Sequence, residues 1–119
     1  MRTRIKIILV FLAIVVTIGI VAFWEAGIYN IDLSTYRGSY DDYGNWMGAT
    51  IFVTVSHRFG ATATITVFCE IYLPDSTTNI KLQQLTMSMG DQKIVSFWFS
   101  SADTGNQIPV QYKTWLETP

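Results

Sequence analysis

The sequence predicts an all-β protein, an antiparallel β-sandwich preceded by one N-terminal transmembrane helix. An uncharged apolar run occupies residues 7–24, and beyond residue 30 apolar and polar residues alternate with a period of two, as in strands. Turn residues separate the alternating segments at intervals of roughly 8 to 12 residues, the spacing typical of sandwich strands. No segment beyond residue 30 has a helical apolar period of useful length. We therefore expect five to seven short strands after the helix.

The apolar run IILVFLAIVVTIGIVAFW extends from Ile7 to Trp24. At about 1.5 Å per residue it spans roughly 27 Å as a helix, close to the ~30 Å hydrocarbon core of a bilayer. The basic residues Arg2, Arg4 and Lys6 precede it, and basic flanks stay on the cytoplasmic side. We expect a cytoplasmic tip at residues 1–6, a single-pass helix at 7–27 with Trp24 at the outer interface, and the remaining residues outside the cell membrane.

Charge is distributed unevenly about this segment. The chain of 119 residues holds 8 Lys and Arg against 9 Asp and Glu, a net charge of -1, yet three of the basic residues lie in the first six positions. The outer part is therefore acidic, which argues against a nucleic-acid partner. A hydrophobic share of 50% with 14% charged residues also excludes a disordered chain.

A cleaved signal peptide is the alternative to an anchor, because it too has a basic start and an apolar core. Signal cores are typically ~7 to 15 residues long and end in a small-x-small site. The end of this run, IGIVAFWEAG, has no clean site of that kind. We therefore expect the segment to be kept as a membrane anchor in contact with lipid.

Beyond the helix we expect a membrane-proximal stretch rich in Tyr, Gly and Asp at 28–48 and a sandwich core at 49–119. The predicted strands cover residues 50–57, 62–73, 79–89, 93–101 and 108–117. Within the second of them, parity places Ile65 and Val67 inward. In the third, Ile80 and Leu82 fall on the parity opposite to Met87, so a bulge or break is expected near residues 83–84.

The segments ATATITVFCEIY, IKLQQLTMSMGDQKIVSFWFSS and IPVQYKTW resemble the immunoglobulin-like repeats of archaeal and bacterial envelope proteins. Those repeats have a Thr/Val-rich strand, a Leu-x-Met-x-x-Gly-(Asp/Glu) turn and a following aromatic strand. The plan of a basic tip, one helix and such a domain is similar to that of archaellum stator proteins, which contact the surface layer. The resemblance implies an immunoglobulin-like sandwich, although one cysteine cannot form the intersheet disulfide of antibody domains.

Reactive side chains are scarce, so we expect no enzyme and no catalytic residue. The chain has one histidine, His57, and one cysteine, Cys69, and parity places Cys69 inward, where a thiol packs as a small hydrophobe. A blue-copper centre needs two histidines, and a zinc site of His and Cys alone needs four ligands. Met87 and Met89 share a parity and could hold Cu(I), but core packing is the favoured role.

The acidic pair Asp41 and Asp42 lacks the DxDxDG rhythm of calcium loops, so a solvated loop is favoured over a partly loop-supplied calcium site. The motifs GxGxxG, GxxxxGK[ST], GxSxG and HExxH do not occur. We therefore expect no cofactor and no metal.

Aromatic residues are the most informative feature for function, because many of them fall on outward parities. Large exposed apolar patches mark interfaces. We expect a protein partner, either another envelope protein or a second copy of the chain, with carbohydrate stacking and lipid headgroups as alternatives. The candidate interface residues are Tyr36, Tyr40, Tyr43, Trp46, Phe68, Tyr72, Trp98 and Trp115.

These observations favour a non-enzymatic, membrane-anchored interaction protein whose outer domain docks onto partners of an envelope assembly, through side chains or by β-augmentation at a strand edge. The alternative is a non-catalytic accessory subunit of a membrane enzyme complex of the oxidase or monooxygenase type. A filament subunit is less favoured. A type IV pilin has a processing site ahead of the apolar run, and no such site precedes Ile7 in this sequence.

Overall fold

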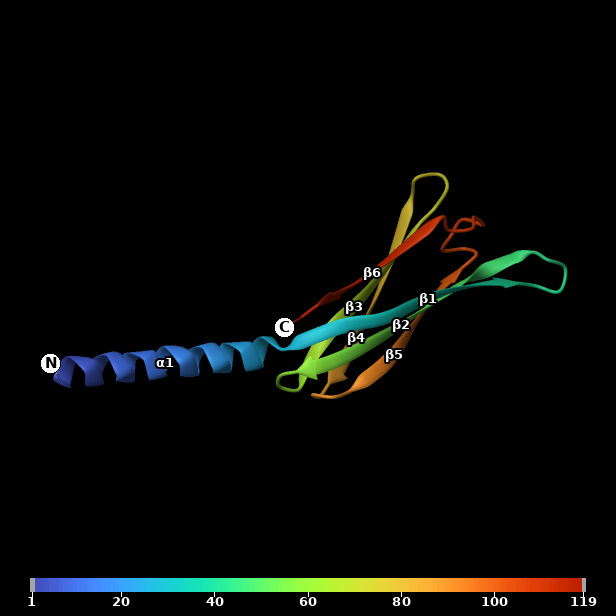
Figure 1. Cartoon of the computed structure of the whole chain (residues 1–119). Helices are drawn as coiled ribbons and strands as arrows, with labels where there is room; N and C mark the ends of the chain where they lie inside the picture. Colours follow the sequence, from blue (N-terminus) through green and yellow to red (C-terminus); the bar gives the residue numbers. More distant parts are fainter. Residues whose placement is uncertain (1, 119) are drawn as a thin grey trace.

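The computed structural model describes residues 2–118 as one long helix followed by two three-stranded antiparallel sheets (Figure 1). The elements are α1 (Arg2–Ala26), β1 (Ile28–Tyr40), β2 (Trp46–Phe59), β3 (Ala63–Tyr72), β4 (Thr78–Met87), β5 (Gln92–Ser100) and β6 (Gln111–Glu117). One sheet has the order β1-β2-β5 and the other the order β4-β3-β6. The predicted all-β class and the strand number are confirmed. We call residues 28–117 the β domain.

The two sheets share one buried apolar core. Alternate residues of the central strands β2 and β3 point into it, as do those of β5, and their side chains are at most 3% exposed. This is the packing that the period-two pattern predicts, because successive strand residues face opposite sides of a sheet. The core residues of these three strands are Ile51, Val53, Val55, Ile65, Val67, Cys69, Ile71, Val95, Phe97 and Phe99.

Residues 28–48 are part of the β domain. They form β1, a tight hairpin turn and the start of β2, and the hairpin reaches the end of the domain remote from α1 (Figure 1). The alternation of β1 is interrupted by register shifts between Ile31 and Leu33 and between Ser39 and Tyr40. A bulge of this kind inserts a residue and reverses the parity beyond it, which conceals a strand from pattern analysis.

The expected bulge in β4 is wrong. β4 pairs with β3 in continuous register from Thr78 to Met87. Ile80 and Leu82 point to the outer face and are 51% and 57% exposed, whereas Met87 is fully buried. The change of phase in the sequence therefore reflects apolar residues on both faces of a regular strand.

The last strand is shorter than predicted. It begins at Gln111, and Ile108 and Val110 lie before it with exposed fractions of 48% and 68%. Ile108, Val110, Tyr112 and Leu116 share one parity in the predicted strand, and of these four only Tyr112 and Leu116 pack against the core. The Pro at position 109 lacks a backbone N–H and cannot donate to a sheet, which explains the later start.

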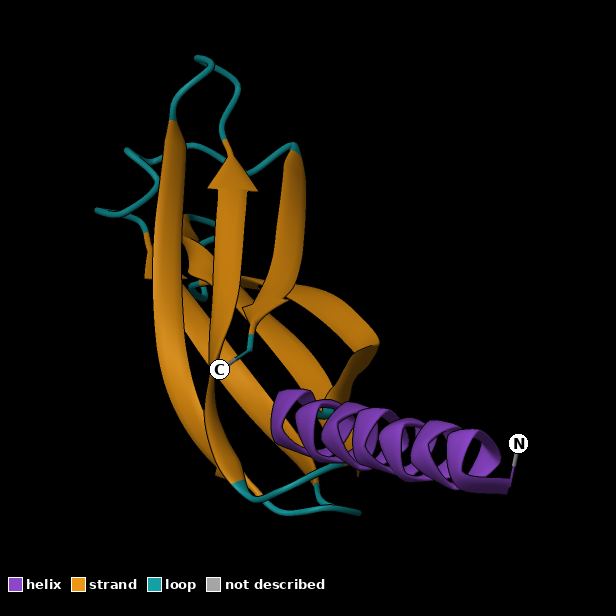
Figure 2. Ribbon diagram, turned by 90° about the vertical axis from the view of Figure 1, so that its left-hand side faces the viewer, coloured by secondary structure: helices purple, strands orange, loops and turns teal. Residues whose placement is uncertain are grey.

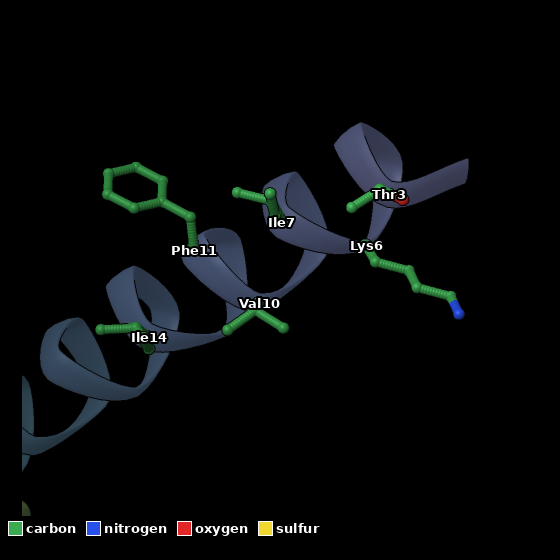
Figure 3. Close-up of a pocket in the computed structure, with 6 residues that line it drawn as sticks. All are labelled: Thr3, Lys6, Ile7, Val10, Phe11 and Ile14. Carbon is green, nitrogen blue, oxygen red and sulfur yellow. The ribbon is translucent and has the colours of Figure 1, made fainter. Parts of the chain in front are cut away.

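The helix α1 is long and apolar enough to span a membrane, and none of its residues is buried. It projects from the β domain, giving the molecule a long dimension of 84 Å (Figure 2). Side chains near its start, including Ile7, Val10, Phe11 and Ile14, form an open apolar surface beside Lys6 (Figure 3). Lipid acyl chains are the solvent that suits such a surface.

The junction between α1 and the β domain is packed. Gly27 adopts a positive φ of 71° and ends the helix, with its N–H donating to the carbonyl oxygen of Phe23 at 3.0 Å. The ring of Phe59, at the end of β2, lies 5.1 Å from that of Phe23 and 5.2 Å from that of Trp24. The N–H of Ala61 donates to the carbonyl oxygen of Trp24 at 3.0 Å. The helix is therefore held by the β2–β3 turn.

Candidate interaction surfaces

The outer face of the sheet β4-β3-β6 carries an apolar row that crosses all three strands. Leu82 and Trp115 are the register partners of Phe68 on either side. The rings of Phe68 and Trp115 stack with centroids 5.2 Å apart and planes within 1°. Leu82 is more than half exposed, and Phe68 and Trp115 are partly exposed. We call these three residues the outer row.

Polar groups border the outer row. The next register positions place Ile80, Glu70 and Lys113 side by side across the sheet. The Lys113 ammonium lies 5.5 Å from the centroid of the Trp115 ring, within the range of a cation–π contact. Tyr72 follows on the same face, and its hydrogen bond with Glu70 raises the pKa of the phenol. The face thus combines exposed apolar side chains with a charged border, as interfaces do.

The outer face of the other sheet is also partly apolar. Its exposed side chains are Leu33 of β1, Phe52 of β2, and Ile94 and Trp98 of β5, with exposed fractions of 59%, 37%, 70% and 45%. Leu33 and Ile94 both pair with Thr54, so they flank β2 in one register position. Trp98 therefore lies on the face opposite to Trp115, and the two tryptophans belong to different surfaces.

The aromatic residues of the β1–β2 hairpin separate into different environments. Trp46 is anchored, because its indole Nε1–H donates to Thr104 Oγ1 at 3.1 Å and its ring meets Tyr40 edge-on at 5.4 Å. Tyr36 stacks on Tyr112 of β6 with centroids 6.2 Å apart. Tyr43 is at the hairpin tip and is 91% exposed. These four predicted residues do not form one patch.

The two lateral borders between the sheets are closed to different degrees. At the β4/β5 border, Lys81, Gln83 and Lys93 donate to backbone carbonyl oxygens of the opposite edge strand at 2.6, 2.5 and 2.7 Å. At the β1/β6 border, the Tyr112 hydroxyl donates to the carbonyl oxygen of Ser34 at 3.1 Å. A groove of about 320 Å³ lies beside β6 there, lined by Tyr36, Pro109, Val110, Gln111 and Tyr112.

His57 and Cys69 are core groups in different sheets. The His57 ring is fully buried, with Nε2 lying 2.8 Å from the carbonyl oxygen of Phe59 and Nδ1 3.3 Å from that of Met87. Burial raises the pKa of the Cys69 thiol to about 12, so the sulfur stays protonated at neutral pH. The geometry does not pair this histidine with the cysteine as base and nucleophile.

The methionine and aspartate residues considered as metal ligands are Met87, Met89 and Asp41, and the structure does not bring them together as one site. Met87 is buried in the core, whereas Met89 lies in the following turn and is 52% exposed, so the predicted shared face is wrong. The Asp41 carboxylate accepts the N–H groups of Tyr43 and Asn45 at 2.9 and 2.8 Å, which closes the hairpin turn. Among residues 2–118, no group of three or more His, Cys, Asp or Glu side chains is placed to hold a metal.

The basic flank residues Arg2, Arg4 and Lys6 lie exposed in the first turns of α1, and Trp24 in its last turn is 39% exposed. Part of the Trp24 ring covers Phe59 at the junction, so this residue has a packing role in addition to the predicted interfacial one. These four residues therefore lie at the two ends of α1.

Phe68, Tyr72 and Trp115 are the predicted interface residues that the structure gathers on one face. Leu82 and Ile80 belong to the same face but are absent from the predicted set, and the signal that identifies them is their parity opposite to Met87. No protein-family model, curated protein or solved structure matches the chain significantly.

Proposed function

We propose that the chain is a non-enzymatic, single-pass membrane protein whose β domain lies outside the cytoplasm and docks onto partner proteins of a cell-envelope assembly. The outer row carries this proposal. Soluble monomeric domains rarely leave contiguous large apolar side chains in water, and such patches mark interfaces. A row of Leu82, Phe68 and Trp115 with a charged border has the composition of an interface centre.

The strand order supports an immunoglobulin-like topology for this domain. In such domains the strands A, B and E form one sheet, and C′, C and F lie adjacent in the other. The orders β1-β2-β5 and β4-β3-β6 follow this arrangement when the strands are taken in chain order as A, B, C, C′, E and F. Within residues 2–118 there is no counterpart of strand G beside β6.

The topology in the membrane rests on charge and helix packing. Three basic residues precede the apolar helix, which favours a cytoplasmic N-terminus. Trp24, at the other end of α1, has the amphipathic character of residues at the outer interface, and Phe23 lies beside it. The cell membrane is the proposed location.

Affinity purification of the full chain from its host in mild detergent, followed by sizing and mass spectrometry, tests the docking function. Envelope or filament proteins should co-purify with the wild type. Leu82→Ala should lose them without a change in melting temperature, and Gln84→Ala, an exposed neighbour on β4, should retain them. Recovery with polytopic metalloprotein subunits would favour the accessory-subunit alternative, and a chain that purifies alone would contradict docking.

A further inference from the structure

The outer edge of β6 is a candidate pairing surface. β6 is the terminal strand of its sheet, and no other strand in residues 2–118 pairs with it on that side. A strand edge exposes a row of backbone N–H and C=O groups that another chain can pair with. The β4/β5 border has its edge carbonyls bound by lysine and glutamine side chains. At the β1/β6 border, Tyr112 bonds to the backbone of β1 and stacks on Tyr36, and a groove lies beside β6.

The charges of β6 are arranged symmetrically about Trp115. Lys113 and Glu117 lie two residues to either side of it, and alternation places all three side chains on the outer face. Lys113 and Glu117 make no ion pair with any other residue of the range 2–118. An antiparallel copy of the same strand, centred on Trp115, would place each lysine opposite a glutamate.

We propose that β6 pairs antiparallel with β6 of a second copy, about a two-fold axis at Trp115. This inference rests on the proposed docking function and names a second copy as a partner. Lys113 of one copy then faces Glu117 of the other, twice, because a two-fold interface repeats each contact. Directly opposed opposite charges stabilise a strand pair. The outer rows of the two copies join into one apolar band across a six-stranded sheet.

β1 is the other edge strand at this border, but it is a poorer candidate. Its charges Asp32 and Arg37 are also of opposite sign, yet the Asp32 carboxylate is bound by Arg58 at 2.9 Å and Gln92 at 3.1 Å. The register shift between Ile31 and Leu33 also distorts this strand. Bulges of this kind protect an edge from pairing.

The antiparallel arrangement has a consequence for the membrane anchors. β6 runs toward the end of the β domain from which α1 leaves, because it is antiparallel to β3 and the turn before β3 bonds to α1 through Ala61 (Figure 1). Reversing the strand direction in the second copy places its helix at the opposite end. The pair therefore joins two facing membranes, and it does not form between neighbours in one membrane.

Disulfide trapping of the full chain in detergent tests the register. Opposed residues of an antiparallel pair have Cα atoms about 4.5–5.5 Å apart, within the range that a disulfide bridges. Trp115→Cys should crosslink with itself, and Lys113→Cys should crosslink only when mixed with Glu117→Cys. Gln84→Cys, on the far edge of the sheet, should not crosslink. Equal crosslinking of all variants, or none for Trp115→Cys, would overturn the pairing.

Charge reversal tests the same pairing without cysteines. Lys113→Glu or Glu117→Lys alone replaces two attractive contacts by two repulsive ones, and we expect each to weaken dimerisation by about tenfold, measured by sizing at several concentrations. The double variant restores opposite charges and should restore the dimer. Both side chains are exposed, so the β domain should keep its melting temperature. A monomeric wild type, or a dimer insensitive to single reversal, would overturn the proposal.

Reconstitution into phosphatidylcholine vesicles tests the membrane geometry. Wild-type vesicles should cluster by light scattering, single-reversal vesicles should stay separate, and the double variant should cluster again. A dimer in detergent without vesicle clustering would contradict the facing-membrane arrangement. The docking function has a separate readout, because loss of partners in Leu82→Ala does not depend on the edge of β6.

Discussion

The imidazole of His57 stacks on the phenol ring of Tyr29, with centroids 4.2 Å apart and planes 15° from parallel. The two residues are register partners on β2 and β1, close to the end from which α1 leaves. Burial raises the pKa of Tyr29. The stack therefore links β1, the first strand after α1, to the buried part of β2.

Replacing His57 with Ala should lower the free energy of unfolding by about 2–4 kcal/mol, because it leaves a cavity and removes the hydrogen-bond donor that faces buried carbonyl oxygens. Urea unfolding in a fixed detergent measures the change. Arg58→Ala is the matched control, since its ion pair with Asp32 is exposed and worth less than about 1 kcal/mol. Similar losses for both variants would contradict a structural role for the imidazole.

Position 48 requires glycine because β2 and β5 approach each other closely there. Its φ is +145°, and a Cβ there would lie 2.8 Å from Trp98 Cη2 and would collide with the carbonyl oxygen of Phe99. Gly48→Ala should therefore cost about 2 kcal/mol or more in unfolding free energy, from strain and overpacking together. Gly44→Ala, also at positive φ but in open space, should cost about 1 kcal/mol. Equal melting temperatures for the two variants would contradict this prediction.

Sequence patterns predict the strands whose two faces differ in polarity. β2, β3 and β5 alternate large apolar residues with polar ones, so parity is enough to assign inward residues such as Val53, Val67 and Phe97. β1 escapes this reasoning because a bulge at Asp32 shifts its phase. Parity gives the wrong result for β4 because Ile80 and Leu82 are apolar but lie on the solvent side of the sheet. Packing of the core does not require apolar residues at these positions.

The candidate surface was predictable only where parity alone decides exposure. Phe68, Trp98 and Trp115 are partly or largely exposed as expected. Trp46 and Tyr36 lie near other aromatic residues in the chain, but contacts with Thr104 and Tyr112, some 60 to 80 positions away, give them packing roles. Such long-range contacts follow from strand order, which a single sequence does not reveal.

The Cys69 thiol should be unreactive in the folded chain. Its pKa is raised to about 12 from 9.0 by burial, so little thiolate forms at pH 8. The thiol ionises at a lower pH in the unfolded chain than in the folded one. The contribution of Cys69 to the free energy of unfolding is therefore fully present below pH 9.0 and is lost as the pH rises toward about 12. Maleimide labelling before and after urea unfolding, with Cys69→Ala as the control for the alkaline slope, measures both effects. Rapid labelling of the folded chain would contradict burial of the Cys69 thiol.

Acid should destabilise the β domain through its hydrogen-bonded aspartates. Lys81, 2.9 Å from the carboxylate, and the backbone N–H of Ser100 lower the pKa of Asp103, and bonds from Asn45 lower that of Asp41. Near pH 3.8, the ordinary pKa of an aspartate, the folded state therefore binds fewer protons than the unfolded state. The contribution of these carboxylates to the free energy of unfolding is present above pH 3.8 and is lost as the pH falls below it. Asp103→Asn should flatten the acid limb of a melting-temperature profile, whereas Asp42→Asn should leave it unchanged. Identical profiles would contradict this role of Asp103.

The charge division about α1 predicts how the chain is oriented. A Tyr43→Cys variant places a thiol at the 91% exposed hairpin tip, and the buried Cys69 serves as an internal control that stays unlabelled. In intact cells a membrane-impermeant maleimide should label the tip thiol if the β domain lies outside. Replacing Arg2, Arg4 and Lys6 with Gln removes the basic flank, and the labelled fraction should fall, because basic residues near the helix start retain that end in the cytoplasm. Labelling that requires cell lysis, or that is unchanged by the triple substitution, would mean that another feature sets the topology.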